Sequence, residues 1–140
     1  MAETTATVRV KEEEELRGLF KQAESIREQI DVINDTILDI ETVLETLAFI
    51  KDKGRDKTVL VPIGGGNFIR AKIIDTENVI MGVGGRLSIE AGIDEAREML
   101  RDRVRVLEDL RLQLAKKLEE VNAKITELIE KIRTQKSQST

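Results

Sequence analysis

The sequence contains no cysteine and no histidine, one proline, and three phenylalanines as its only aromatic residues. Without cysteine or histidine, the chain has no disulfide bonds, thiolate nucleophiles, zinc sites of the usual kind or imidazole acid–base catalysis. The first residues lack the apolar core of a signal peptide, and no apolar run reaches the length of a membrane span. Carboxylates, Lys, Arg and hydroxyls are the chemical groups that remain, which weakens any interpretation as an enzyme. We expect a cytoplasmic protein that is not an enzyme, with no catalytic residues, no cofactor and no bound metal.

The sequence is rich in charged residues and poor in aromatic ones. Asp, Glu, Lys and Arg make up 36% of the 140 residues, and the net charge is −4. Aromatic side chains usually fill the centre of a compact core, so an elongated molecule built on aliphatic seams is favoured over a globule. No segment is basic enough to bind phosphates along a nucleic acid. We predict neither a nucleic-acid partner nor a membrane partner.

Apolar residues recur every three or four positions in the first third of the chain. This spacing, about 3.5 residues on average, keeps one seam facing a partner helix. It predicts a coiled-coil helix within residues 9–54, from about Lys11 to Lys53, with Gly54 as its stop. The acidic run Glu12 to Glu15 is interpreted either as an exposed first turn or as an acidic rim for a basic partner. The seam consists of Leu16, Leu19, Ala23, Ile26, Ile30, Ile33, Ile37, Ile40, Leu44 and Leu47.

A second heptad pattern occupies residues 92–135 and predicts a helix from about Ile93 to Gln135. Its seam positions are apolar except for Arg97 and Arg111, which either determine the register or lay their stems along the seam. In an antiparallel pair, the arginine-rich start of this helix would lie beside the acidic later half of the first. The charges therefore favour a helical hairpin over a parallel dimer. We expect the tails, residues 1–8 and 136–140, to be disordered.

Residues 57–91 differ from both flanks and contain four short β-rich runs, at about 58–63, 68–74, 79–83 and 86–90. The glycines Gly64 to Gly66 raise the possibility of a phosphate-binding loop. Such a loop requires a Lys and a Ser or Thr that open a helix directly after the last glycine, whereas Asn67, Phe68 and a strand follow here. The glycines are therefore interpreted as turn residues of two β-hairpins.

Two small hairpins with open edges are marginally stable alone and tend to pair with other chains. This segment is therefore predicted to mediate oligomerisation. The apolar residues predicted to form the interface are Val59, Val61, Ile63, Phe68, Ile69, Ile73, Val79, Met81 and Val83.

The predicted layout is a heptad helix, two hairpins reading VLVPIGGGNFIRAKIIDTENVIMGVGGRLSIE, and a returning heptad helix that opens with GIDEAREMLRDRV. This layout resembles the α class of prefoldin subunits, most closely the archaeal ones. The resemblance covers nearly the whole chain. It implies an α+β fold, in which a long antiparallel two-helix coiled coil is joined by two β-hairpins that form an intersubunit β-barrel. Arg86 and Leu87 stand where family members often carry an aromatic pair.

The resemblance also implies a function and partners. It implies an ATP-independent chaperone, or holdase, that binds unfolded client proteins at its coiled-coil tips and transfers them to a group II chaperonin. The assembly would contain two α and four β prefoldin subunits. A filament-forming or scaffold coiled-coil protein of the prefoldin-like type is the alternative. The tip residues implied to contact clients are Leu16, Leu19, Phe20, Leu128, Ile129 and Ile132, with Val8 and Val10 in the flanking tail.

Overall fold

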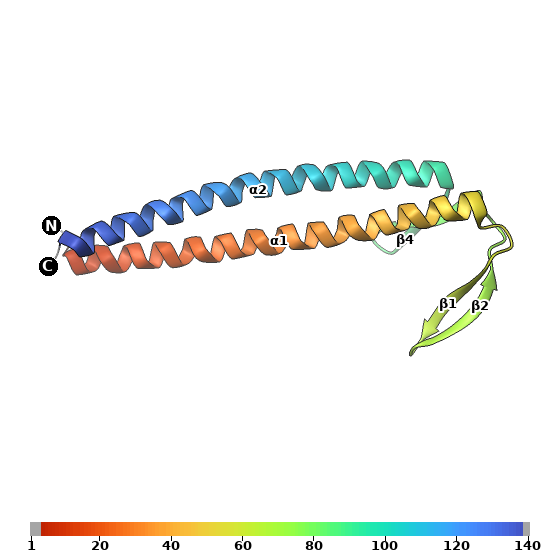
Figure 1. Cartoon of the computed structure of the whole chain (residues 1–140), viewed down its shortest axis with the longest axis horizontal. Coiled ribbons are helices and arrows are strands. Elements are labelled where there is room, and N and C mark those ends of the chain that lie inside the picture. The colour runs from red at the N-terminus through yellow and green to blue at the C-terminus, as the bar shows by residue number, and fades with distance from the viewer. Residues whose placement is uncertain (1–3, 139–140) are drawn as a thin grey trace. The chain divides into compact units, whose positions relative to one another are not determined.

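The computed structural model describes residues 4–138 and contains two long helices separated by two β-hairpins (Figure 1). This confirms the α+β class and the predicted order of elements. The chain divides into two compact units, which we call the terminal unit (residues 4–35 and 107–138) and the central unit (residues 36–106). The elements are α1 (Thr5–Lys53), β1 (Thr58–Gly64), β2 (Asn67–Lys72), β3 (Asn78–Gly84), β4 (Leu87–Gly92) and α2 (Ile93–Gln138).

In the terminal unit, α1 and α2 pack side by side and run antiparallel. Glu12 is hydrogen-bonded to Gln135, and Asn34 to Arg111, so the residue numbers fall along α2 as they rise along α1. The predicted antiparallel pairing is confirmed for this unit. Its buried core contains Ala23 and Ile26 of α1 with Val121 and Ile125 of α2, and the half-buried Leu16, Leu19, Ile30, Leu114 and Leu118 pack against it.

Arg111 makes a specific polar contact across the seam. Its Nη1 donates a hydrogen bond to Oδ1 of Asn34 at 2.8 Å, and the contact is partly buried. A buried polar pair forms in one alignment of the two helices only, so this contact favours a single register. Ion pairs between the helices include those of Lys131 with Glu12 and of Lys51 with Asp94. The arginines at the start of α2 do not form ion pairs with the acidic later half of α1 in the described chain.

The helices extend beyond the predicted boundaries. α1 begins at Thr5 rather than near Lys11, and α2 continues past Gln135 to Gln138. The hydroxyl Oγ1 of Thr4 accepts a hydrogen bond from the backbone N–H of Thr7 at 3.2 Å, which is the contact of an N-cap residue. Residues 5–8 and 136–138 are therefore helical, in contrast to the disordered tails that we predicted. Residues 1–3 and 139–140 lie outside the described part of the chain.

α1 ends at Lys53, as predicted, and Gly54 makes the stop possible. The N–H of Gly54 donates a hydrogen bond to the carbonyl oxygen of Ile50 at 3.0 Å. A Cβ atom at position 54 would lie 2.6 Å from that same oxygen, closer than any real contact of this kind. Glycine is therefore required because the chain turns tightly against the last helical turn.

In the central unit, the second hairpin packs against the helices. Ala91 of β4 is buried together with Leu47 of α1 and with Ile93 and Ala96 of α2. The side-chain Nζ of Lys51 lies 2.6 Å from Oδ1 of Asp94 beside this core. The hydrogen bond from Lys51 lowers the pKa of Asp94 below its ordinary value. Four half-buried apolar residues pack against this core, namely Ile50, Val79, Met81 and Leu100.

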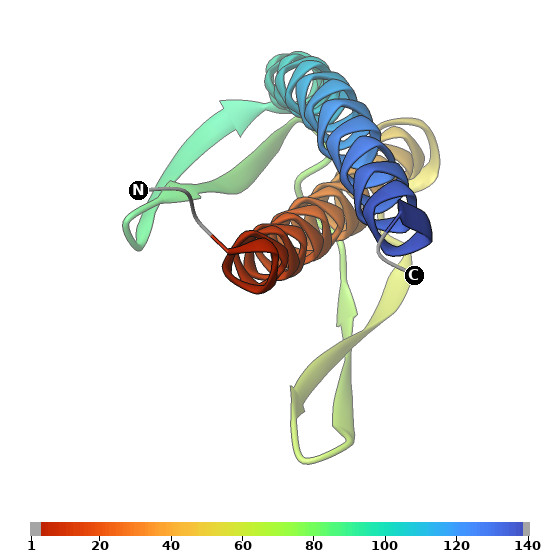
Figure 2. The same cartoon turned by 90° about the vertical axis from the view of Figure 1, so that its left-hand side faces the viewer.

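The two hairpins have the same design, twenty residues apart, and Figure 2 shows them as separate two-stranded ribbons. Val61 pairs with Ile69 in the first, and Met81 pairs with Ile89 in the second. Each has an irregular register just before its turn, and each turn contains three successive residues with positive φ. These are Gly64, Gly65 and Gly66 in the first turn and Gly84, Gly85 and Arg86 in the second.

The turns confirm the predicted role of the glycines and correct two strand boundaries. β4 begins at Leu87, because Arg86 has φ of 62° and belongs to the turn. β2 ends at Lys72 rather than Ile74. Ile73 still forms two backbone hydrogen bonds, donating its N–H to Lys57 and accepting from the N–H of Asp56, both at 3.0 Å.

Candidate functional site

The tip of the terminal unit is the end at which the start of α1 lies beside the end of α2. Phe20 is 50% exposed and Ile129 is 38% exposed, and both lie off the seam. Val10, also off the seam, is exposed as well. Apolar side chains of this size normally gain free energy on burial, so the tip offers contact area to an apolar ligand.

The other predicted tip residues belong to the seam. Leu16 and Leu19 are half-buried and pack against the core of the terminal unit. Leu128 is buried, and Ile132 is half-buried. The closed tip therefore exposes Phe20 and Ile129, whereas the four seam residues are buried or half-buried in it.

Glu12 is buried, which corrects our interpretation of the acidic run as a wholly exposed first turn. It is 6% exposed, whereas Glu13, Glu14 and Glu15 are exposed as expected. Its Oε1 accepts a hydrogen bond from Nε2 of Gln135 at 3.3 Å and lies 3.5 Å from Nζ of Lys131. The heptad spacing offered one signal, because Glu12 stands four residues before Leu16 on the same seam, but the burial also depends on Gln135 of α2.

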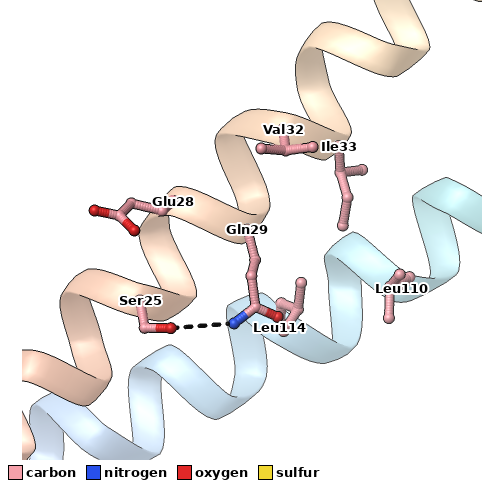
Figure 3. A pocket seen from close by; sticks show the side chains of 7 residues that line it. All are labelled: Ser25, Glu28, Gln29, Val32, Ile33, Leu110 and Leu114. Atoms are coloured by element: carbon pink, nitrogen blue, oxygen red, sulfur yellow. Dashed lines mark hydrogen bonds between the residues drawn. The ribbon is translucent and has the colours of Figure 1, made fainter.

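A shallow groove lies on the terminal unit, lined from α1 by Ser25, Glu28, Gln29, Val32 and Ile33 and from α2 by Leu110 and Leu114. Figure 3 shows Ile33 pointing towards α2 and the carboxylate of Glu28 pointing away from it. Nε2 of Gln29 donates a hydrogen bond to Oγ of Ser25 at 3.4 Å. Glu28 is the one titratable side chain of the seven, so the groove offers apolar contact rather than acid–base chemistry.

The first hairpin exposes most of its predicted interface. Val61 and Ile69 face each other on one side of the ribbon, and both are exposed. Ile63 is exposed on the same strand, and Phe68 is exposed on the opposite face. The structure places Val59 and Ile73 at intermediate burial.

The second hairpin uses part of its predicted interface within its own chain. Val79 and Met81 are half-buried and pack on the core of the central unit. Val83, near the turn, remains exposed. Two of the predicted interface residues therefore already have partners in the single chain, and the first hairpin is the one with more uncovered apolar surface.

Sequence reasoning missed several of the most exposed apolar residues of the hairpins. Leu60 is 65% exposed and pairs with Arg70, and Ile80 is 75% exposed and pairs with Glu90. Leu87 is also exposed. The run from Val59 to Val61 is apolar at successive positions, and such a run indicates a strand that is covered on both faces in its final environment.

Asp75 orders the link between the two hairpins. Its Oδ1 accepts hydrogen bonds from the backbone N–H groups of Glu77 at 2.9 Å and Asn78 at 3.0 Å. These donors stabilise the carboxylate and hold the pKa of Asp75 below its ordinary value. The link is therefore held in one conformation by a local turn.

The two β-hairpins have open edges and exposed apolar side chains, and such edges pair readily with other chains. Together with the antiparallel helices, they define the class of this protein as a coiled-coil subunit of a larger assembly. In residues 4–138, no helix combines the length and hydropathy that a membrane crossing requires.

The model of the family "Prefoldin subunit" matches residues 19–138. The chain is 39% identical over 120 residues to prefoldin subunit alpha 2 of Thermococcus kodakarensis, which covers 86% of this chain and 84% of the relative. It is 32% identical over 118 residues to prefoldin subunit alpha of Pyrococcus horikoshii, covering 84% and 80%. The chain belongs to the prefoldin family of chaperone subunits, in its α class and with archaeal relatives, and this family assembles into oligomers of prefoldin subunits.

A solved structure shares the fold. The cryo-EM structure of filamentous PFD from Methanocaldococcus jannaschii contains a chain that matches with a TM-score of 0.76 and 33% identity. The match covers 85% of this chain and 98% of that chain. Two long helices with two antiparallel hairpins are thus the arrangement of a known prefoldin structure, which confirms the fold that the sequence resemblance implied.

Proposed function

We propose that this chain is the α subunit of an ATP-independent holdase that binds unfolded proteins at the tip and transfers them to a group II chaperonin. In this proposal the protein acts in the cytoplasm and has no enzymatic step, cofactor, membrane or nucleic-acid partner. Membership of the prefoldin family supports a chaperone role for the chain. The tip carries the proposed contact with clients.

The single observation that carries the proposal is the apolar surface at the tip. Phe20 and Ile129 are exposed there, directly beside the half-buried Leu16, Leu19 and Ile132. Full burial of one such side chain is worth about 1.5–3 kcal/mol, so one tip binds an unfolded segment weakly and reversibly. Several tips in one assembly would hold a chain much more tightly than one, because the later contacts are intramolecular.

The hairpins are proposed to join this chain to β-class prefoldin subunits, with two α and four β subunits in a shared β-barrel. The exposed Val61, Ile69 and Phe68, together with the additional residues Leu60 and Ile80, supply apolar surface for this purpose. Each hairpin is a separate two-stranded sheet, so its outer backbone groups remain available for pairing with strands of other subunits.

The tip is tested by light scattering from guanidine-unfolded citrate synthase, diluted into the chain with a β-class partner and no ATP. The wild-type assembly should suppress aggregation at near-stoichiometric amounts. The triple variant Phe20→Ser, Ile129→Ser, Ile132→Ser should suppress it less, with the oligomer intact by size-exclusion chromatography. Leu112→Ser is the matched control, because Leu112 is also an exposed apolar residue of α2. Equal suppression by the triple variant and the control would rule out the tip as the client site.

Filament formation or a scaffold role is the second candidate, favoured by the similarity to a chain of filamentous PFD. In this case the hairpins would join copies of this chain to one another. Electron microscopy separates the two functions: filaments from the chain alone support the scaffold, and compact particles that require a β-class partner support the holdase.

A further inference from the structure

The last layer of the seam in the terminal unit is polar on both helices. The next seam positions beyond Leu16 and Ile132 are Glu12, four residues earlier in α1, and Gln135, three residues later in α2. Both side chains turn inward far enough to hydrogen-bond each other at 3.3 Å, and Glu12 is 6% exposed. An apolar residue at position 12 would instead continue the seam to the end of the pair.

Glu12 is incompletely satisfied in this position. Its Oε1 has both nearby partners, Gln135 and the Nζ of Lys131 at 3.5 Å, whereas its Oε2 is buried without a hydrogen-bond partner. A buried carboxylate that lacks partners is less stable than the same group in water. Separation of the helices at this layer returns the whole carboxylate to water. The tip therefore opens more readily than a layer of buried aliphatic residues would.

We propose that Glu12 is a positioning residue that favours separation of the two helices at the tip. In this way it controls access to the apolar seam. Opening uncovers Leu16, Leu19 and Leu128, which then bind an extended, apolar segment of an unfolded polypeptide in place of the opposite helix. This inference rests on the proposed holdase function and identifies the residue that regulates access to its client site.

The opening is tested by amide hydrogen exchange of the full chain assembled with a β-class partner. In Glu12→Met, amides of residues 5–20 should exchange about tenfold more slowly, because a linear apolar side chain closes the seam. Lys131→Gln should have the opposite effect, because it removes the cation beside Glu12. Glu14→Met, at an exposed position two residues away, is the control and should leave the exchange unchanged.

The same three variants are then assayed with guanidine-unfolded citrate synthase. If Glu12→Met lowers the open population tenfold, its apparent affinity for the client should fall by up to about tenfold, because the closed tip still presents Phe20 and Ile129. The proposal is overturned if exchange in Glu12→Met equals that of the wild type, or if exchange slows without any loss of client binding. If the wild-type assembly does not suppress aggregation, the holdase function and the client role of the opening both fail, and the exchange data separately establish whether Glu12 loosens the seam.

Discussion

Replacement of Arg86 with glycine should stabilise the second hairpin. Arg86 has φ of 62°, in the left-handed region that disfavours any side chain. This conformation costs a non-glycine residue about 1–2 kcal/mol, and the extra freedom of glycine in the unfolded chain offsets about 0.5–1 kcal/mol of the relief. The net stabilisation should be about 0.5–1 kcal/mol.

The first hairpin provides the reverse experiment at its equivalent position. Gly66 has φ of 79°, and nothing lies within 4 Å of the place where its Cβ would be. A side chain therefore fits there in space, and the backbone conformation alone opposes it. Gly66→Arg should destabilise the first hairpin by about the amount that Arg86→Gly stabilises the second.

Amide hydrogen exchange measured by NMR would resolve the two hairpins in one chain. Arg86→Gly should slow exchange of the β3–β4 amides about two- to fivefold, in proportion to the free-energy change, and leave β1–β2 unaffected. Unchanged or faster exchange in β3–β4 would refute the argument that the turn is strained at Arg86. A change of the same size in both hairpins would refute it too, since it would indicate a global effect.

Three further predictions concern the helix end, the seam and the link. Gly54→Ala should lower the free energy of unfolding by about 1–3 kcal/mol in urea titrations, because its Cβ would meet backbone atoms of Ile50. Asn34→Ala should lower it by about 1–2 kcal/mol by leaving the partly buried guanidinium of Arg111 unpaired, whereas Asn34→Asp should retain most of the stability. The pKa of Asp75 is lower in the folded chain than in the unfolded chain, so the unfolded chain binds the proton first as the pH falls. The ionised Asp75 therefore stabilises the folded chain fully above about pH 4, and this stabilisation is lost as the pH falls through the folded-state pKa. Asp75→Asn keeps an acceptor but does not titrate, and should flatten this part of an acid-unfolding curve followed by circular dichroism; an unchanged curve would contradict the assignment.

The predicted elements matched the structure wherever local rules were sufficient. The seam from Leu16 to Leu47 predicted α1 because its heptad spacing is unbroken and the stretch contains no proline. The glycine turns placed both hairpins within one or two residues of their observed bounds. Gly54 marked the end of α1 correctly.

The candidate site was predicted less completely, because burial depends on contacts between distant parts of the chain. Phe20 and Ile129 were recognisable as off-seam apolar residues. The burial of Glu12 followed from the earlier start of α1 and from Gln135, more than one hundred residues away. Leu60 was passed over, although its apolar neighbours on both sides indicate a strand covered on both faces.

The sequence by itself determined the helices, the two turns and the family, because each depends on periodicity or on residues close together in the chain. The tertiary structure decided which side chains are covered. It buried Glu12 in a polar last layer of the seam, placed Val79 and Met81 against the core of the central unit, and left most apolar side chains of the first hairpin exposed. The physical reason is that a local pattern specifies the face a side chain occupies, whereas only packing between distant segments specifies what lies opposite that face.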